Sequence, residues 1–157
     1  MDVIVDVEKD PATKRRTLEV LTARLPQWFG HSESNRHYAR QAELLDGWMA
    51  RVGGRAAGLL LMKQHGPASR EIYWLGVDPT FHRRGVGRSL VAAVERQAKN
   101  DKVKFLFVMT LHPQVDYEPY QRTRAFYEGM GFDFALPSGQ GPVSSSSSPL
   151  AYYLKAL

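Results

Sequence analysis

Basic and glycine residues gather in residues 82–90, where a strand is expected to end and a helix to begin. The first N–H groups of a helix have no intrahelical acceptor, and the helix dipole is positive at that end. Glycine lets such a backbone approach a ligand closely. The pattern predicts a phosphate-binding turn, with a basic helix end on the surface as the alternative. The candidate contacts are Arg83, Arg84, Gly85, Val86, Gly87, Arg88 and Ser89.

Two common phosphate-binding patterns do not fit this segment. The dinucleotide fingerprint needs a third glycine where Leu90 stands, and the Walker tripeptide Gly-Lys-Ser/Thr does not occur. What remains resembles the acetyl-coenzyme-A loop of the GNAT superfamily of N-acetyltransferases, Gln/Arg-x-x-Gly-x-Gly/Ala, with His82 as a departure at the first position. The resemblance implies acetyl-CoA as cosubstrate, with its diphosphate on backbone N–H groups of residues 84–89.

A second segment, residues 124–132, resembles the Ala-x-x-Phe-Tyr-x-x-x-Gly-Phe pattern that closes GNAT cofactor sites. Two positions depart from this pattern: Thr123 stands where alanine is frequent, and Tyr120 stands at a pantetheine-contact position where asparagine is common. Tyr127 matches the tyrosine that faces the coenzyme sulfur, and a neutral phenol can donate a proton to a leaving thiolate. The alternative is an aromatic pair that packs a helix onto a sheet.

Glu71 is the candidate general base. It lies 14 residues before Gly85, the spacing of the catalytic glutamate in the histone-acetyltransferase branch of GNAT. Direct transfer needs a base because an amine of pKa about 10.4 is only about one part in 2,500 neutral at pH 7. Glu71 would act directly or through water. The alternative is an acid that pairs with Arg70 or Arg55. Alternation along the strand predicts that Glu71, Tyr73, Leu75 and Val77 share one face.

The resemblance also implies that pantetheine pairs with the backbone of Leu75, Gly76 and Val77 like an added strand. In the family the acceptor pocket is often built from two loops. Here these contain Trp28 with Phe29, and Asp116 with Glu118, which could attract a cationic acceptor. Both segments are equally compatible with ordinary loops.

Periodicity predicts strands at 2–7, 47–52, 55–64, 71–77, 104–111, 132–136 and 151–156, and helices at 11–24, 35–45, 88–99 and 120–130. This order resembles the GNAT fold over residues 2–157. We therefore expect a mixed α/β (α+β) fold, a central sheet of six to seven strands flanked by about four helices. Residues 1–157 would form one domain, with a flexible serine-rich loop at 138–149.

Composition limits the classes that remain. The 157 residues include no cysteine, which excludes disulfides and a cysteine nucleophile and favours a reducing, cytoplasmic location. No signal peptide or membrane span is expected. The five histidines have no metal-ligand spacing, so we expect no metal site. The net charge of +5 favours an anionic partner, a phosphorylated cofactor more than nucleic acid, because the chain has no basic run with interleaved aromatic residues and no zinc-finger or RNA-binding signature.

The sequence thus predicts an acetyl-CoA-dependent N-acetyltransferase that acts by direct transfer to a primary amine. We expect a small-molecule acceptor more than a protein, and a homodimer is compatible with the chain. Lysine or N-terminal acetylation of protein or peptide is the alternative within enzymes. A non-catalytic basic module that binds nucleic acid or an acidic protein on the same fold is the alternative outside them.

Overall fold

A computed structural model describes residues 2–138 and 149–157. Seven strands form one sheet in the order β1-β2-β3-β4-β5-β7-β6, and every neighbouring pair is antiparallel except β4 with β5. The elements are β1 (Val3–Glu8), α1 (Pro11–Arg24), α2 (Ser32–Leu44), β2 (Asp46–Val52), β3 (Arg55–Gln64), β4 (Ser69–Val77), the 3-10 turn η1 (Pro79–Phe81), α3 (Val86–Asn100), β5 (Phe105–Leu111), α4 (Glu118–Gly129), β6 (Asp133–Ser138) and β7 (Leu150–Ala156).

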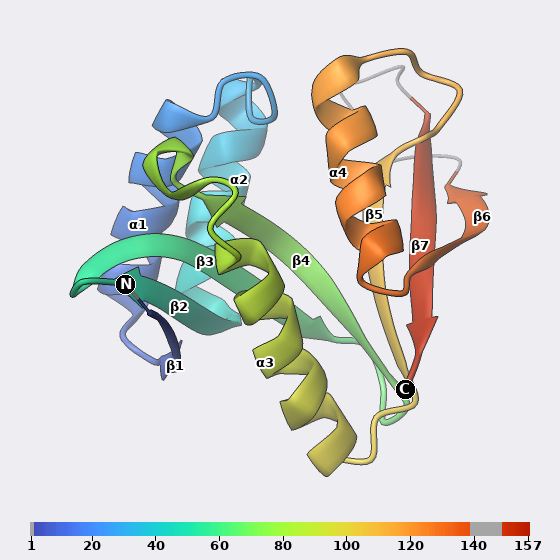
Figure 1. Ribbon diagram of the computed structural model, residues 1–157, viewed down its shortest axis with the longest axis horizontal. Helices are drawn as coiled ribbons and strands as arrows, with labels where there is room; N and C mark the ends of the chain where they lie inside the picture. The colour runs from blue at the N-terminus through green and yellow to red at the C-terminus, as the bar shows by residue number, and fades with distance from the viewer. Residues whose placement is uncertain (1, 139–148) are drawn as a thin grey trace.

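Two hydrophobic cores lie on opposite faces of the sheet (Figure 1). One is formed by α3 and α4 with residues such as Leu60, Leu90 and Leu106. The other lies under α1 and α2 and contains Leu18 and Trp74. The first core spans strands from β2 to β7, whereas the second covers only β2, β3 and β4. Helices α1 and α2 therefore do not cover β5, β7 and β6 on this face of the sheet.

Local sequence signals explain where several elements begin. Asp10 caps α1 because its carboxylate accepts the Thr13 N–H at 3.0 Å, and Pro11 occupies the first turn. Gly53 and Gly54 have φ of +57° and +79°, which the two-residue turn between β2 and β3 requires. The sequence therefore places this hairpin correctly.

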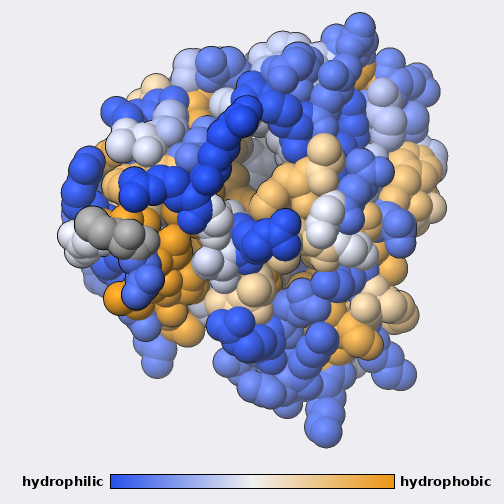
Figure 2. All heavy atoms as spheres, in the orientation of Figure 1, coloured by the Kyte–Doolittle hydropathy of each residue, from blue (hydrophilic) through white to orange (hydrophobic). Residues whose placement is uncertain are grey.

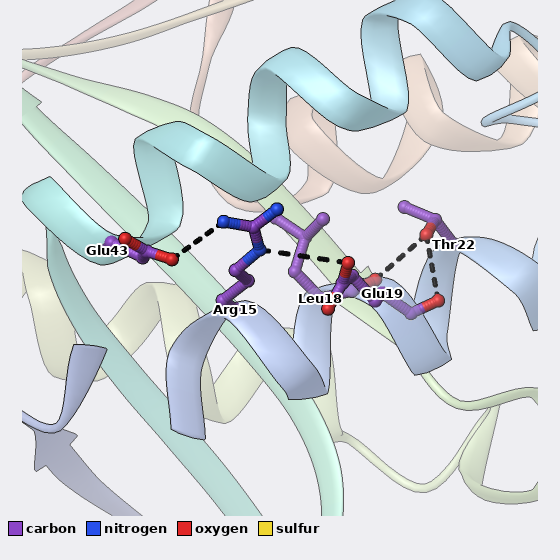
Figure 3. Close-up of polar contacts among 5 residues, drawn as sticks. All are labelled: Arg15, Leu18, Glu19, Thr22 and Glu43. Carbon is purple, nitrogen blue, oxygen red and sulfur yellow. Dashed lines mark hydrogen bonds and ion pairs between the residues drawn. The ribbon is translucent and has the colours of Figure 1, made fainter. Parts of the chain in front are cut away.

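Helices α1 and α2 are joined at their exposed edge by Arg15, which contacts Glu43 at 2.8 Å and Glu19 at 3.7 Å (Figure 3). Further along α1, the Thr22 hydroxyl donates to the carbonyl oxygen of Leu18, one turn before it, at 2.9 Å. Exposed ion pairs contribute little to stability, so fully buried Leu18 does more to hold this helix pair on the sheet.

Strands β4 and β5 pair over only part of their length. Ser69–Ile72 pairs with Phe105–Val108, and both strands then continue apart, as Figure 1 shows. The register between β3 and β4 shifts at the same place, because Met62 pairs with Ile72 while Leu61 pairs with Trp74. Tyr73 is the extra residue of a β-bulge, and a bulge bends its strand.

The bulge overturns one expectation about β4. Tyr73 contacts Tyr38 of α2, and Lys63, the cross-strand partner of Glu71, lies over the Tyr73 ring, so Glu71 and Tyr73 both lie on the α2 face. Leu75 and Val77 pack instead on the α3 core. The four residues do not share a face, because the inserted residue reverses the alternation.

The element order, the seven-stranded sheet and the four helices agree with the sequence prediction. Helix α3 begins at Val86, two residues earlier than expected, because Gly85 adopts a left-handed conformation with φ +77° as its N-cap. The predicted serine-rich loop at 138–149 falls almost wholly outside the described residues. Within the part of the chain that the structure describes, no helix is long and apolar enough to cross a membrane.

Candidate functional site

A cavity of about 510 Å³ opens where β4 and β5 diverge. Figure 2 shows a hollow beside α4, with hydrophilic side chains on its rim. The start of α3 lines one side and α4 the opposite side. Strand residues lie between them, from Ile72 to Val77 on β4 and from Val108 to Thr110 on β5. The cavity therefore occupies the V between the two parallel strands.

The loop before α3 presents backbone donors to this cavity. The first helical bond of α3 runs from the Ser89 N–H to the Gly85 carbonyl oxygen at 2.9 Å. The N–H groups of Val86, Gly87 and Arg88 precede it and have no intrahelical acceptor. The Ser89 N–H is therefore used within the helix, whereas those of Val86, Gly87 and Arg88 lie at the cavity.

The three arginines of this loop differ in placement. Arg83 and Arg88 line the cavity, and Arg83 has φ +61°, an unusual backbone conformation for a residue other than glycine. Arg84 lies outside the lining, with its guanidinium 5.7 Å from the centre of the Phe81 ring. Two of the three predicted charges therefore face the cavity.

His82 has a structural role in this loop. Its Nε2 donates to the Val77 carbonyl oxygen at 2.8 Å, so the side chain holds the loop against the end of β4. Its ring also meets the Trp28 ring edge-on, with centroids 6.2 Å apart. The hydrogen bond to Val77 and the contact with Trp28 give His82 a structural role at the position where the family pattern has glutamine or arginine.

Tyr127 reaches the cavity from α4 and is 4% exposed. Its ring packs edge-on against Phe126 and Phe132. Burial, with a smaller contribution from Tyr120, raises the pKa of the Tyr127 hydroxyl, so this group is neutral at pH 7. No described residue hydrogen-bonds to that hydroxyl. Tyr127 is thus both a packing residue and a protonated group at the cavity.

Glu71 is buried on the α2 face and does not line the cavity. Its Oε1 lies 2.7 Å from His65 Nε2, whereas Arg70 pairs with Asp101. Burial raises the pKa of the neighbouring Tyr73 to about 12, with smaller contributions from the charges of Tyr38 and Glu71. Glu71 therefore lies just behind Tyr73, which does line the cavity.

The loop between α1 and α2 is fixed to the start of α4 by what we term the bridge, residues 27–28 with residues 117–123. The Trp28 Nε1–H donates to the Pro119 carbonyl oxygen and to Thr123 Oγ1, each at 3.1 Å. In return the Tyr120 hydroxyl donates to the Trp28 carbonyl oxygen at 3.0 Å, and the Tyr117 hydroxyl to that of Gln27 at 2.7 Å. The bridge joins the two halves of the divided sheet beside the cavity.

The predicted acceptor residues divide into two groups. Trp28 and Phe29 line the cavity, and Phe29 stacks on Trp74 with ring centroids 5.0 Å apart. Asp116 and Glu118 are absent from the lining and bind within their own segment, Asp116 to Gln121 at 2.6 Å and Glu118 to Arg122 at 2.8 Å. These two carboxylates therefore contribute no charge to the cavity wall.

Sequence reasoning did not find several lining residues, among them Tyr38, Tyr73, Thr110 and Arg122. Tyr38 and Tyr73 can be recognised as lining residues only from the tertiary structure around the bulge. Tyr120 was detectable as a departure from the family pattern, and its hydroxyl serves the bridge. Within residues 2–138 and 149–157, no three His, Cys, Asp or Glu side chains group in a way that could hold a metal ion.

Comparisons with known proteins give the same architecture. The sequence profile of the acetyltransferase (GNAT) family matches residues 15–132. A protein from Desulfovibrio desulfuricans assigned to the GNAT family superposes with TM-score 0.82 and 17% identity, covering 99% of both chains. A GNAT acetyltransferase from Elizabethkingia anophelis with acetyl-CoA bound gives TM-score 0.72 and 14% identity, covering 99% of this chain and 98% of that one.

The ribosomal-protein-S18-alanine N-acetyltransferase of Escherichia coli gives TM-score 0.73 and 16% identity, covering 98% of this chain and 94% of that one. The curated proteins include no significant match. Because the family profile covers most of the chain, the protein belongs to the GNAT acetyltransferase family and is an acyltransferase by class. The sequence-based family assignment is confirmed.

We expect the buried tyrosines of the cavity to make folding sensitive to alkaline pH. Burial raises the pKa of Tyr120 to about 12, above the value near 10 of an unfolded tyrosine. The unfolded chain therefore releases this proton first, and the free energy of unfolding falls between pH 10 and 12. Urea titrations at pH 9 to 12 should show a smaller fall for Tyr120→Phe. Equal slopes would contradict this explanation.

Proposed function

We propose that the protein transfers the acetyl group of acetyl-CoA directly to a primary amine on a small molecule. The observation that carries the proposal is the division of β4 from β5, with the unpaired N–H groups of α3 beside it. Val86, Gly87 and Arg88 would bind the diphosphate, with charge from Arg83 and Arg88. The unpaired edge of β4 from Leu75 to Val77 would hold the pantetheine amides.

Glu71 is the proposed base, acting through water because its side chain lies behind the cavity wall. It takes one proton from the ammonium form of the acceptor. The free amine then forms the new C–N bond at the thioester carbonyl, and the C–S bond breaks. The hydrogen bond to His65 keeps the Glu71 carboxylate in place for this transfer.

Tyr127 is the proposed acid. Its hydroxyl gives a proton to the departing thiolate and regains one from the nitrogen of the new amide, so the protonation of the tyrosine is restored. A raised pKa suits this role, because the group carries its proton until the thiolate appears. The overall exchange yields an N-acetyl amine, free CoA thiol and one proton, which Glu71 releases to solvent.

A protein or peptide acceptor is the second candidate, favoured by the likeness to a ribosomal-protein acetyltransferase. The bridge argues for the small acceptor, since Trp28, Tyr120 and Thr123 line the cavity and are held together by its hydrogen bonds, which limits the room for a chain of residues. Purified protein assayed for free thiol with acetyl-CoA and a panel of amines and peptides decides between the two. The binding-module alternative predicts steeply salt-dependent binding of DNA or RNA without acetyl-CoA affinity.

Gly87→Glu should weaken acetyl-CoA binding by more than about tenfold. A Cβ at this position would lie 3.3 Å from the Phe126 ring, and the carboxylate would face the diphosphate. Calorimetry with acetyl-CoA measures the effect. Gly66→Glu is the matched control, because a Cβ there meets nothing within 4 Å. Unchanged affinity in a folded Gly87→Glu variant would reject the proposed cofactor loop.

Glu71→Gln should lower turnover about 100-fold at pH 7, within the range of general-base effects. Activity should recover as pH rises towards the pKa of the amine, since free amine then accumulates. Acetyl-CoA affinity should persist. Glu43→Gln, which alters an exposed carboxylate paired with Arg15, is the control for charge alone. Wild-type turnover of Glu71→Gln across the pH range would assign Glu71 a structural role.

Tyr127→Phe should lower turnover by roughly tenfold to a thousandfold, the effect of losing a general acid. The melting temperature should change little, because the ring that packs on Phe132 is retained. Tyr153→Phe provides the control, as Tyr153 is a buried tyrosine that does not line the cavity. Full activity with lost stability would show that Tyr127 only packs the core and that water supplies the proton.

A further inference from the structure

We propose that the acceptor is a monoamine whose single ammonium group is attached through a short chain to an aromatic ring. This inference rests on the proposed function and specifies its substrate class. It follows from two properties of the cavity on the α2 side of the sheet: the composition of its wall and the distribution of charge around it.

Aromatic side chains dominate that part of the wall. Five half-buried aromatic residues contribute: Trp28, Phe29, Tyr38, Tyr73 and Tyr120. Tyr38 and Tyr73 meet edge-on, with centroids 5.4 Å apart and planes at 69°. Aromatic rings favour this geometry and offset stacking with one another. A substrate ring placed among them would pack against the wall in the same edge-on or stacked geometry that these rings already have with one another.

The wall is also fixed before any ligand arrives. Three of its rings are held by specific contacts: Trp28 and Tyr120 through the bridge, and Tyr73 through a hydrogen bond of 3.0 Å between its hydroxyl and His37 Nε2. Phe29 stacks on Trp74. Side chains that are ordered in advance lose little entropy on binding, so this surface suits a rigid, planar group.

Charge around the cavity excludes acceptors with several cationic groups. Among the described residues that line it, none is a carboxylate, and Arg122 is the charged lining residue that remains once Arg83 and Arg88 are assigned to the diphosphate. On the α2 face, Lys63 adds a further positive charge 5.4 Å from the centre of the Tyr73 ring.

Glu71 lies behind the wall on the same face of β4 as Tyr73, because its cross-strand partner Lys63 lies over the Tyr73 ring. One carboxylate can balance one ammonium group. The second ammonium of a polyamine or aminoglycoside would meet Arg122 and Lys63 on the acceptor side without a carboxylate in the lining to balance it, which costs free energy.

The test compares acceptors on the intact protein with saturating acetyl-CoA. The arms are 2-phenylethylamine, n-hexylamine, spermidine, kanamycin and a peptide with a free N-terminus and one lysine. We expect kcat/KM for 2-phenylethylamine to exceed that of every other acceptor by about tenfold or more. This is the difference expected when one substrate makes favourable aromatic contacts that the others lack.

Tyr38→Leu tests the wall itself, because it replaces a ring with an apolar group. It should raise KM for 2-phenylethylamine about threefold to tenfold and change KM for n-hexylamine less. Phe134→Ala is the control, since it removes a ring that is 45% exposed and outside the cavity. A Tyr38→Leu variant that shifts both KM values equally would overturn the aromatic assignment.

The remaining outcomes separate the inference from the proposed function. Preferred turnover of spermidine, kanamycin or the peptide would overturn the aromatic monoamine while leaving the transferase intact. Acetyl-CoA binding without acetylation of any arm, or no acetyl-CoA binding at all, would overturn the proposed function and this inference together.

Discussion

The departure of β4 from β5 after Ile72 is the constraint on which the rest of the site depends. A sheet interior normally satisfies every backbone N–H and C=O by strand pairing. Here two neighbouring strands in the middle of the sheet each gain an unpaired edge. The bulge at Tyr73 bends β4 at the point of separation, so the opening is built into the strand itself. An extended ligand with alternating amide groups is the natural complement of such edges.

A divided sheet needs a second connection between its halves, and the bridge supplies it. The Tyr120 hydroxyl donates to the Trp28 carbonyl oxygen and the Trp28 Nε1–H donates to the Pro119 carbonyl oxygen, and Arg122 lies 5.3 Å from the centre of the Trp28 ring. Each neutral hydrogen bond contributes about 1 kcal/mol, so the group of contacts matters more than any member. Because Trp28 also touches His82 of the glycine loop, the same indole connects the proposed acceptor wall to the proposed cofactor loop.

Features that depend on local sequence could be predicted, and those that depend on the bulge could not. The glycine hairpin at residues 53–54 is encoded by neighbouring residues, so its position was correct, whereas α3 begins two residues earlier than predicted because Gly85 caps it. The face of Glu71 depends on one inserted residue in β4, which leaves no mark in the alternation of the sequence. Its partner His65 is six residues away across a turn, and Tyr38 comes from another helix. These contacts require the tertiary fold.

Gly76 shows how the two sides of the cavity are linked through one strand. Its position was predicted from the family as a pantetheine contact, yet the structure gives another reason for glycine there. A Cβ on Gly76 would lie 2.3 Å from Trp74 Cη2, so the indole can lie along β4 only over a residue without a side chain. Trp74 in turn supports Phe29 on the acceptor side, although its own Nε1–H is buried without a partner among the described residues. Such a donor costs about 1–3 kcal/mol. The packing of a large indole against the second core offsets that cost, and the strand expected to bind the cofactor thereby also sets the acceptor wall.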